Sequence, residues 1–142
     1  RRKLGLTIEQ SDDLKLIEAF LSWMQKNKKD YTITFRGFTK DPDSLFEDAE
    51  GKTWYEQYQR RLSLEQISPE KRGKMMAQAN PKFVLRNYLA QEAIQDAEKS
   101  DFTRLIKLLE ALKNPYAENP EFDDFAKAPP EWGKKLEISC SS

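Results

Sequence analysis

Apolar and polar positions follow the period of an α-helix along most of the chain, most clearly over residues 80–100. Proline suits the first turn of a helix, and no glycine or further proline interrupts the stretch between Pro81 and Ser100. At 100° per residue, one broad face carries these apolar side chains: Phe83, Leu89, Ala90, Ala93, Ile94 and Ala97. The pattern predicts a helix over 80–100. Further apolar residues in its first half predict that this half is enclosed from more than one side.

Arg86 falls in the middle of that apolar face. A guanidinium on the inner face of a helix needs a carboxylate or several carbonyl groups as partners, because an unpaired buried charge costs about 3–5 kcal/mol. We therefore expect Arg86 to be buried and to have one of two roles. The favoured role is structural, in which Arg86 pins a loop or the C-terminal tail. The other is coupling, in which it contacts a phosphate or an acid in a part of the polypeptide outside this chain.

Two further stretches carry regular apolar stripes. One begins at a cap formed by Ser11 or Asp12 and ends near Asn27, and the other begins at Ser100 or Asp101. The first stripe and the residues that widen it are Leu14, Ile17, Leu21 and Met24, with Leu16, Phe20 and Trp23. The second is Phe102, Leu105, Leu109 and Leu112, with Ile106 and Leu108. The short join at 100–101 predicts that the second helix forms a hairpin with the helix before it.

The segment after Asp30 fits two patterns. Tyr31, Ile33 and Phe35 alternate as in a strand, whereas Tyr31, Phe35 and Phe38 have helical spacing. No second strand-like run lies nearby to pair with it, so we predict a short helix capped by Asp30.

Three capping signals predict three more short helices. They are Asp41 before Pro42, a capping box from Thr53 to Glu56 after a break at Gly51, and Ser68 before Pro69. The helix that follows the capping box should bury Trp54, Tyr58 and Leu62. Its arginines, Arg60 and Arg61, are expected to face solvent or to form ordinary ion pairs.

Beyond Asn114 the sequence becomes proline-rich, yet it keeps three large aromatic residues: Phe122, Phe125 and Trp132. Solvated tails rarely carry so many, so this tail is expected to wrap the helical part. We predict an all-α chain, a bundle of roughly seven helices with an irregular, proline-containing C-terminal tail. It should form a single domain, residues 1–142, with a helical body (1–113) and a wrapping tail (114–142).

The amino-acid composition limits the kinds of partner that this chain can be expected to bind. The chain has 142 residues, is 38% hydrophobic, and balances 24 basic against 24 acidic residues, which is typical of a globular protein. Zero net charge argues against general binding to nucleic acid or membrane surfaces, and no apolar run approaches the length of a membrane span. The first residues lack a methionine and the apolar core of a signal peptide. We therefore expect an intracellular piece of a longer polypeptide.

The residues needed for catalysis are sparse. There is no histidine, which excludes the usual zinc sites and histidine-based general-base chemistry, and the five glycines are isolated. A calcium loop beginning at Asp41 would need glycine and glutamate where Phe46 and Lys52 stand. The single cysteine, Cys140, lies third from the end, where a thiol on a mobile arm can reach a second thiol elsewhere. We therefore predict no catalytic, cofactor-binding or metal site in this chain, and Cys140 as a redox candidate.

Several motifs together resemble the C-terminal region of the selenoprotein O family over essentially the whole chain. They are RRKLGL (1–6), DYTITFR (30–36), NPKFVLRNYLAQEAI (80–94), NPY (114–116), PPEW (129–132) and SCSS (139–142). The resemblance implies a full-length protein of several hundred residues with a protein-kinase-like core. It also implies protein adenylyltransferase activity, in which AMP is transferred from ATP to Ser, Thr or Tyr of proteins with Mg²⁺ or Mn²⁺.

In that family the ATP-binding and metal-binding residues lie upstream, so the resemblance assigns no catalytic, ATP-binding or metal-binding residue to this chain. It does assign a position to Cys140, because eukaryotic relatives place selenocysteine there. Cysteine at this position is typical of a bacterial, cytoplasmic member. The expected partners are the upstream kinase-like domain and the protein substrates of the parent enzyme.

The resemblance leads to two hypotheses. In the first, this chain packs on the kinase-like core, and Cys140 pairs with an upstream cysteine and gates activity by redox state. In the second, the chain is a separable interaction module that recruits protein substrates and has no redox role. Both predict that the chain alone is inactive. The isolated chain is also expected to be able to dimerise through surfaces that the upstream part would cover.

Overall fold

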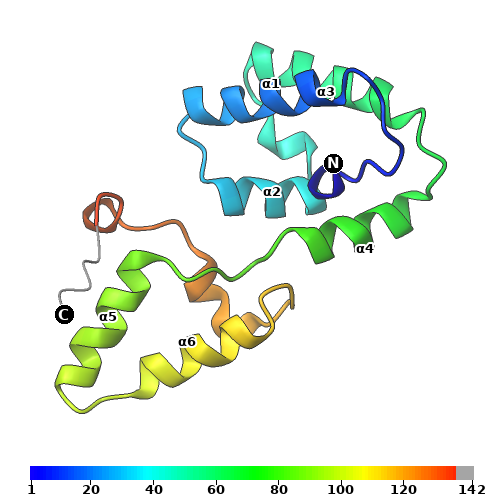
Figure 1. Ribbon diagram of the computed structural model, residues 1–142. Helices are drawn as coiled ribbons and strands as arrows, with labels where there is room; N and C mark the ends of the chain where they lie inside the picture. Colours follow the sequence, from blue (N-terminus) through cyan, green and yellow to red (C-terminus); the bar gives the residue numbers. More distant parts are fainter. Residues whose placement is uncertain (137–142) are drawn as a thin grey trace. The chain divides into compact units, whose positions relative to one another are not determined.

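The computed structural model describes residues 1–136, and the regular structure in this part of the chain is entirely helical (Figure 1). It contains six α-helices and four short 3-10 helices, so the all-α prediction is confirmed. The chain divides into two compact units, Arg1–Pro81 and Lys82–Ser142. The expected single domain with a body (1–113) and a tail (114–142) stays a prediction, and the two units divide the chain at a different point.

The first unit consists of four α-helices and two 3-10 helices. They are α1 (Asp13–Lys26), α2 (Tyr31–Lys40), α3 (Ala49–Leu62) and α4 (Pro69–Ala79), with η1 (Arg2–Leu4) and η2 (Asp43–Leu45). Two predicted caps are confirmed. The Asp30 carboxylate accepts a hydrogen bond from the Ile33 backbone N–H at 2.9 Å, and the Ser68 hydroxyl accepts one from the Lys71 N–H at 3.3 Å. The helical interpretation of the segment after Asp30 is therefore correct.

The core of this unit is rich in aromatic rings. Helix α1 lies against α3, while α2 and η1 lie against α4. The rings of Phe20 and Trp54 stack with their centroids 4.4 Å apart, and those of Trp23 and Phe46 lie 4.9 Å apart. The remaining buried members are Leu4, Leu6, Met24, Phe35, Phe38, Tyr58 and Met76.

Helix α1 buries only one side of the broad face that was expected. Phe20, Trp23 and Met24 are buried, whereas Leu14 and Leu21 of the predicted central stripe are exposed. The rings of Phe20 and Trp23 point inward because they fill the space between α1 and α3. Leu14 and Leu21 lie on the other side of the helix and therefore face outward.

Helix α3 begins earlier than the capping box at Thr53 indicated. It starts after Asp48, whose carboxylate accepts hydrogen bonds from the Gly51 N–H and from Trp23 Nε1, both at 2.9 Å. Gly51 therefore lies inside the first turn of α3 and does not end the preceding segment. The predicted helix after Asp41 is a single 3-10 turn, η2.

The second unit contains a hairpin of two α-helices followed by two 3-10 helices. They are α5 (Asn87–Glu98), α6 (Thr103–Lys113), η3 (Pro120–Ala126) and η4 (Glu131–Gly133). The predicted hairpin between α5 and α6 is confirmed (Figure 1). Its turn contains Ser100 in the left-handed conformation, with φ 65°, and the Asp101 carboxylate accepts a hydrogen bond from the Thr103 N–H at 2.9 Å.

A small core holds this unit together. Tyr88, Leu89 and Leu108 are buried, and partly buried side chains from later in the chain pack against them: Leu112, Phe125 and Leu136. Residues 114–136 thus contribute apolar groups to the hairpin, in keeping with the aromatic content of that segment.

The predicted helix over 80–100 is wrong in its first part. Asn80 is the last capping residue of α4, in an extended conformation with φ −116° and ψ 97°, and its N–H donates to the Met76 carbonyl at 2.9 Å. The helix that carries the remainder of the pattern, α5, begins only at Asn87. The Asn80-Pro81 pair therefore ends one helix and does not begin the next, which is the other common use of a residue before proline.

Contacts from distant residues explain why residues 81–86 are extended. The Lys82 and Phe83 N–H groups both donate to the Pro115 carbonyl, at 2.7 and 3.1 Å. The Phe83 ring is buried and meets the Phe122 ring edge-on at 6.2 Å. Lys82 also donates to Asp123 at 2.5 Å. A helical path would break these contacts, so tertiary structure overrides the local pattern here.

Candidate functional site

The structure places Arg86 at the end of the extended segment, not in the middle of a buried helical face. It is the residue immediately before α5, with φ −98° and ψ 144°, and its side chain is half-buried. The Arg86 side chain takes part in an interaction with a neighbouring group. Arg86 is thus less buried than the helical pattern indicated, and its assignment as a structural or a coupling residue stays a prediction. Cys140, the redox candidate, lies outside the described residues.

A buried ionic cluster that the sequence did not reveal centres on Arg61. Its guanidinium donates to Asp13 at 2.5 Å, to Glu65 at 2.8 Å and to the Ile8 carbonyl at 2.6 Å. The side chains of Arg61, Asp13 and Glu65 are 9%, 3% and 0% exposed. Arg61 was expected to face solvent or to form ordinary ion pairs; it does form ion pairs, with Asp13 and Glu65, but they are buried.

The cluster is closed by hydrogen bonds from the N-terminal segment. Glu65 accepts from the Thr7 hydroxyl, from the Thr7 N–H at 2.9 Å and from the Ile8 N–H at 3.3 Å. The Arg61 hydrogen bond lowers the pKa of Asp13. Burial opposes ionisation of Glu65, but the hydrogen bonds from Thr7 and Arg61 prevail and lower its pKa. The carboxylates of Asp13 and Glu65 thus stay ionised, which fits a structural ion pair better than a role in proton transfer.

A second polar cluster joins α2, α4 and the N-terminal turn around Asn80. The Asn80 side chain is fully buried, and its amide donates to the Lys3 carbonyl at 2.9 Å and to the Thr39 hydroxyl at 3.2 Å. Arg36 donates to the Asn80 and Ala77 carbonyls at 2.8 and 3.0 Å. Arg36 thereby binds carbonyl groups at the C-terminal end of α4, where a positive charge is favourable.

One surface hollow has a volume of 420 Å³ and lies along α1 and α3. It is lined by Leu16, Ala19, Gln57, Arg61 and an Asp12–Lys15 pair. Its two exposed charges form an ion pair at 3.0 Å. Among residues 1–136, no group of three His, Cys, Asp or Glu side chains is placed to hold a metal ion. Within the described part of the chain, no helix is long and apolar enough to cross a membrane.

The class of protein that the described residues define is an all-α protein built from two helical units. In the first unit, buried polar groups join segments of that unit to each other.

Comparison with known proteins identifies the family of this chain. The family model described as "Protein adenylyltransferase SelO" matches residues 1–113. The chain therefore belongs to the SelO family of protein adenylyltransferases, which is the family that the sequence motifs resembled.

Curated relatives cover the whole chain but are much longer. The protein nucleotidyltransferase YdiU of Yersinia pseudotuberculosis serotype O:1b (strain IP 31758) is 46% identical over 151 residues, which cover 100% of this chain and 31% of that protein. The proteins of the same name from Vibrio parahaemolyticus serotype O3:K6 and Erwinia tasmaniensis are 45% and 42% identical, and 32% of each is covered. The chain thus spans about a third of the length of these relatives.

Proposed function

We propose that this chain is the non-catalytic, C-terminal helical part of a protein adenylyltransferase and that it packs on a kinase-like core formed by the rest of the polypeptide. The observation that carries the proposal is the family match over residues 1–113 in a chain that covers only 31% of its relatives. The polar clusters at Arg61 and Asn80 support a structural role, because their side chains are hydrogen-bonded to other groups of this chain.

The parent enzyme transfers AMP from ATP to Ser, Thr or Tyr hydroxyls of proteins, with Mg²⁺ or Mn²⁺ bound beside the nucleotide. The proposal assigns ATP and the metal ion to the remainder of the polypeptide, since the described residues offer neither a phosphate-cradling glycine loop nor a metal-binding cluster. The parent is placed in the bacterial cytoplasm, where a thiol such as Cys140 is normally kept reduced.

A three-way activity assay tests this division of roles. The full-length polypeptide, a version that lacks residues 1–142 of this chain, and this chain alone are each given ATP, Mg²⁺ and a protein acceptor. The full-length protein should transfer AMP, the chain alone should transfer none, and the shortened version should be impaired through its stability or its activity. AMP transfer by the chain alone, or no transfer by the full-length protein, would disprove the proposal.

The redox part of the proposal concerns Cys140. A disulfide between Cys140 and a cysteine of the core would form by exchange with an oxidised thiol pair, which accepts the two electrons and two protons. Mass spectrometry of the full-length protein under non-reducing conditions should find the cross-linked peptide. Cys140→Ser should remove the difference in activity between oxidised and reduced protein, whereas the neighbouring variant Ser141→Ala should keep it. If Cys140 is found only as a free thiol and Cys140→Ser changes nothing, redox gating is wrong.

The alternative function is recruitment of protein substrates. Helix α6 carries exposed apolar residues, and such a surface could bind either a substrate protein or the core of the same polypeptide. In this alternative the chain alone binds the proteins that the parent modifies. Pull-down of a purified acceptor protein by the isolated chain would support recruitment. Binding of the acceptor only by the core would leave packing as the function of this chain.

A further inference from the structure

Helix α6 presents three faces instead of the two of an ordinary surface helix. Leu108 and Ala111 point into the core of the second unit. A polar face carries Thr103, Lys107 and Glu110. The third face contains four large apolar residues within about a 100° arc, and all four are exposed: Phe102 (52%), Leu105 (36%), Ile106 (58%) and Leu109 (52%).

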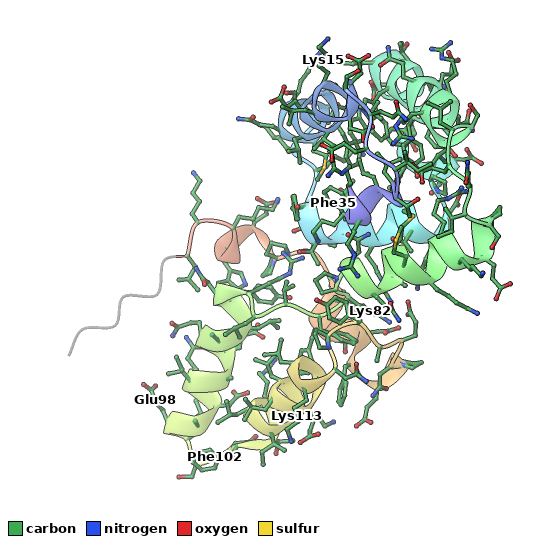
Figure 2. The ribbon with its side chains drawn as sticks, turned by 45° about the vertical axis from the view of Figure 1, so that its right-hand side comes forward. Lys15, Phe35, Lys82, Glu98, Phe102 and Lys113 are labelled. Atoms are coloured by element: carbon green, nitrogen blue, oxygen red, sulfur yellow. The ribbon has the colours of Figure 1, made fainter. Side chains whose placement is uncertain are left out.

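This third face, which we call the α6 apolar face, contains three residues of the predicted stripe, Phe102, Leu105 and Leu109, together with Ile106. The hairpin with α5 uses the side of the helix that carries Leu108 and Leu112, so the α6 apolar face is left outside the unit's own core. Figure 2 shows Phe102 at the turn between α5 and α6, where its side chain projects outward from the hairpin. Single exposed leucines need no explanation, but a continuous apolar row over about two helical turns marks a binding surface.

The area of the α6 apolar face helps to identify what covers it. Four large side chains that are between 36% and 58% exposed present roughly 350 Å². A stable dimer buries about 800 Å² on each partner, so a second copy seated on this face alone has too little contact. A segment of the same polypeptide needs less area, because its covalent attachment removes most of the entropy cost of association.

The length of the relatives indicates that such a segment exists. More than two thirds of each curated relative has no counterpart in this chain. We propose that the α6 apolar face is the surface on which the upstream part of the same polypeptide docks, through an apolar face of its own. The inference rests on the proposed function and adds to it the surface through which the two parts join.

Site-specific thiol labelling tests the proposal with a matched pair of positions. In a Cys140→Ser background, Ile106→Cys places a thiol on the α6 apolar face and Lys107→Cys places one on the polar face of the same helix turn. Maleimide labelling is followed by peptide mass spectrometry, both in this chain alone and in the full-length polypeptide. Both substitutions put a small side chain at an exposed position, so neither should disturb folding.

In the chain alone, both thiols should react rapidly at low protein concentration. In the full-length polypeptide, the rate at position 106 should fall about tenfold or more, because the thiol is then reached only through local opening, while position 107 should change less than about twofold. Equal labelling of position 106 in both proteins would overturn the proposal. Protection of position 106 in the chain alone would also overturn it, since the cover would then be a second copy or another part of this chain.

AMP transfer measured on the same full-length samples separates this inference from the proposed function. Normal transfer with position 106 fully reactive means that the docking surface is wrongly assigned while the proposed function stands. Absence of transfer in the unsubstituted full-length protein means that the proposed function fails, whatever the labelling shows.

Discussion

Arg61 joins three segments of the first unit through one guanidinium. Its donors reach Asp13 at the start of α1, Glu65 beyond the end of α3, and the carbonyl of Ile8 in the N-terminal segment. Arginine suits this position because its fork of donors can serve several acceptors at once and stays charged when buried. The N-terminal segment is thereby fixed on α3 by charge-assisted hydrogen bonds.

Removing this guanidinium should therefore be costly. Arg61→Met leaves two buried carboxylates without their cation and should lower the free energy of unfolding by about 3 kcal/mol. Arg60→Met, on the exposed side of the same helix, should change it by less than about 0.5 kcal/mol. Urea unfolding followed by circular dichroism measures both. A similar, small effect of the two substitutions would show that the cluster contributes little.

The same cluster predicts how stability depends on pH. The pKa of Asp13 is lowered by Arg61, so the folded state binds its proton less tightly than the unfolded state does. Ionised Asp13 therefore stabilises the folded state fully at pH values above 3.8, the ordinary pKa of aspartate, which applies to the unfolded state. This stabilisation is lost as the pH falls through the lower pKa that Asp13 has in the folded state. Unfolding free energies measured between pH 7 and pH 2 should show a steep acid limb that Asp13→Asn flattens. Asp12→Asn, which changes an exposed carboxylate, should leave the limb unchanged.

The burial of the Arg61 and Arg86 side chains could not be predicted correctly from the sequence. Arg86 was singled out because a helical projection placed it among apolar residues, but that projection required a helix where the chain is extended. For Arg61 the sequence left solvent exposure and ordinary ion pairs open, whereas the structure pairs it with the buried Asp13, which lies 48 positions away. Burial of a charge depends on such distant partners, and local spacing carries no information about them.

At the scale of elements, the sequence predicted helices well where the cap is local. Asp30 and Ser68 are bonded to N–H groups three residues ahead, so the signal and its effect lie within one turn. The start of α3 is different, because Asp48 is held by the ring N–H of Trp23 as well as by its own helix. Similarly, the Pro115 carbonyl binds the N–H groups of Lys82 and Phe83 and keeps that segment extended.

Two glycines within helices give opposite predictions. A methyl group at position 51 would lie 2.9 Å from Phe46 Cδ1 and from Trp23 Nε1, both in the core, so Gly51→Ala should destabilise the chain by about 1–3 kcal/mol. At position 73 nothing lies within 4 Å, so Gly73→Ala should stabilise α4 by about 0.5–1 kcal/mol. Thermal unfolding of the two variants beside the parent chain measures both effects. Stabilisation by Gly51→Ala would mean that α1 and α3 are less closely packed than the structure indicates.

At the scale of the whole molecule, the chain has two cores of unequal size. The first unit buries a large cluster of aromatic and aliphatic residues, among them Phe20, Trp23 and Trp54. The second buries a much smaller one around Tyr88, Leu89 and Leu108. This division could not be predicted from the sequence, because apolar stripes of equal regularity occur in both units. The stripe of α6 is as regular as that of α1, yet most of it faces outward.

Unequal cores should produce unequal resistance to local opening, which hydrogen exchange measures amide by amide. In the chain alone, amides of α5 and α6 should exchange faster than those of α1 and α3, because fewer buried contacts must break to expose them. In the full-length polypeptide, protection should rise most in α6, since docking on its apolar face adds contacts that the isolated unit lacks. Protection in α6 that already equals that of α3 in the isolated chain would contradict this expectation, because the small core would then suffice without any partner.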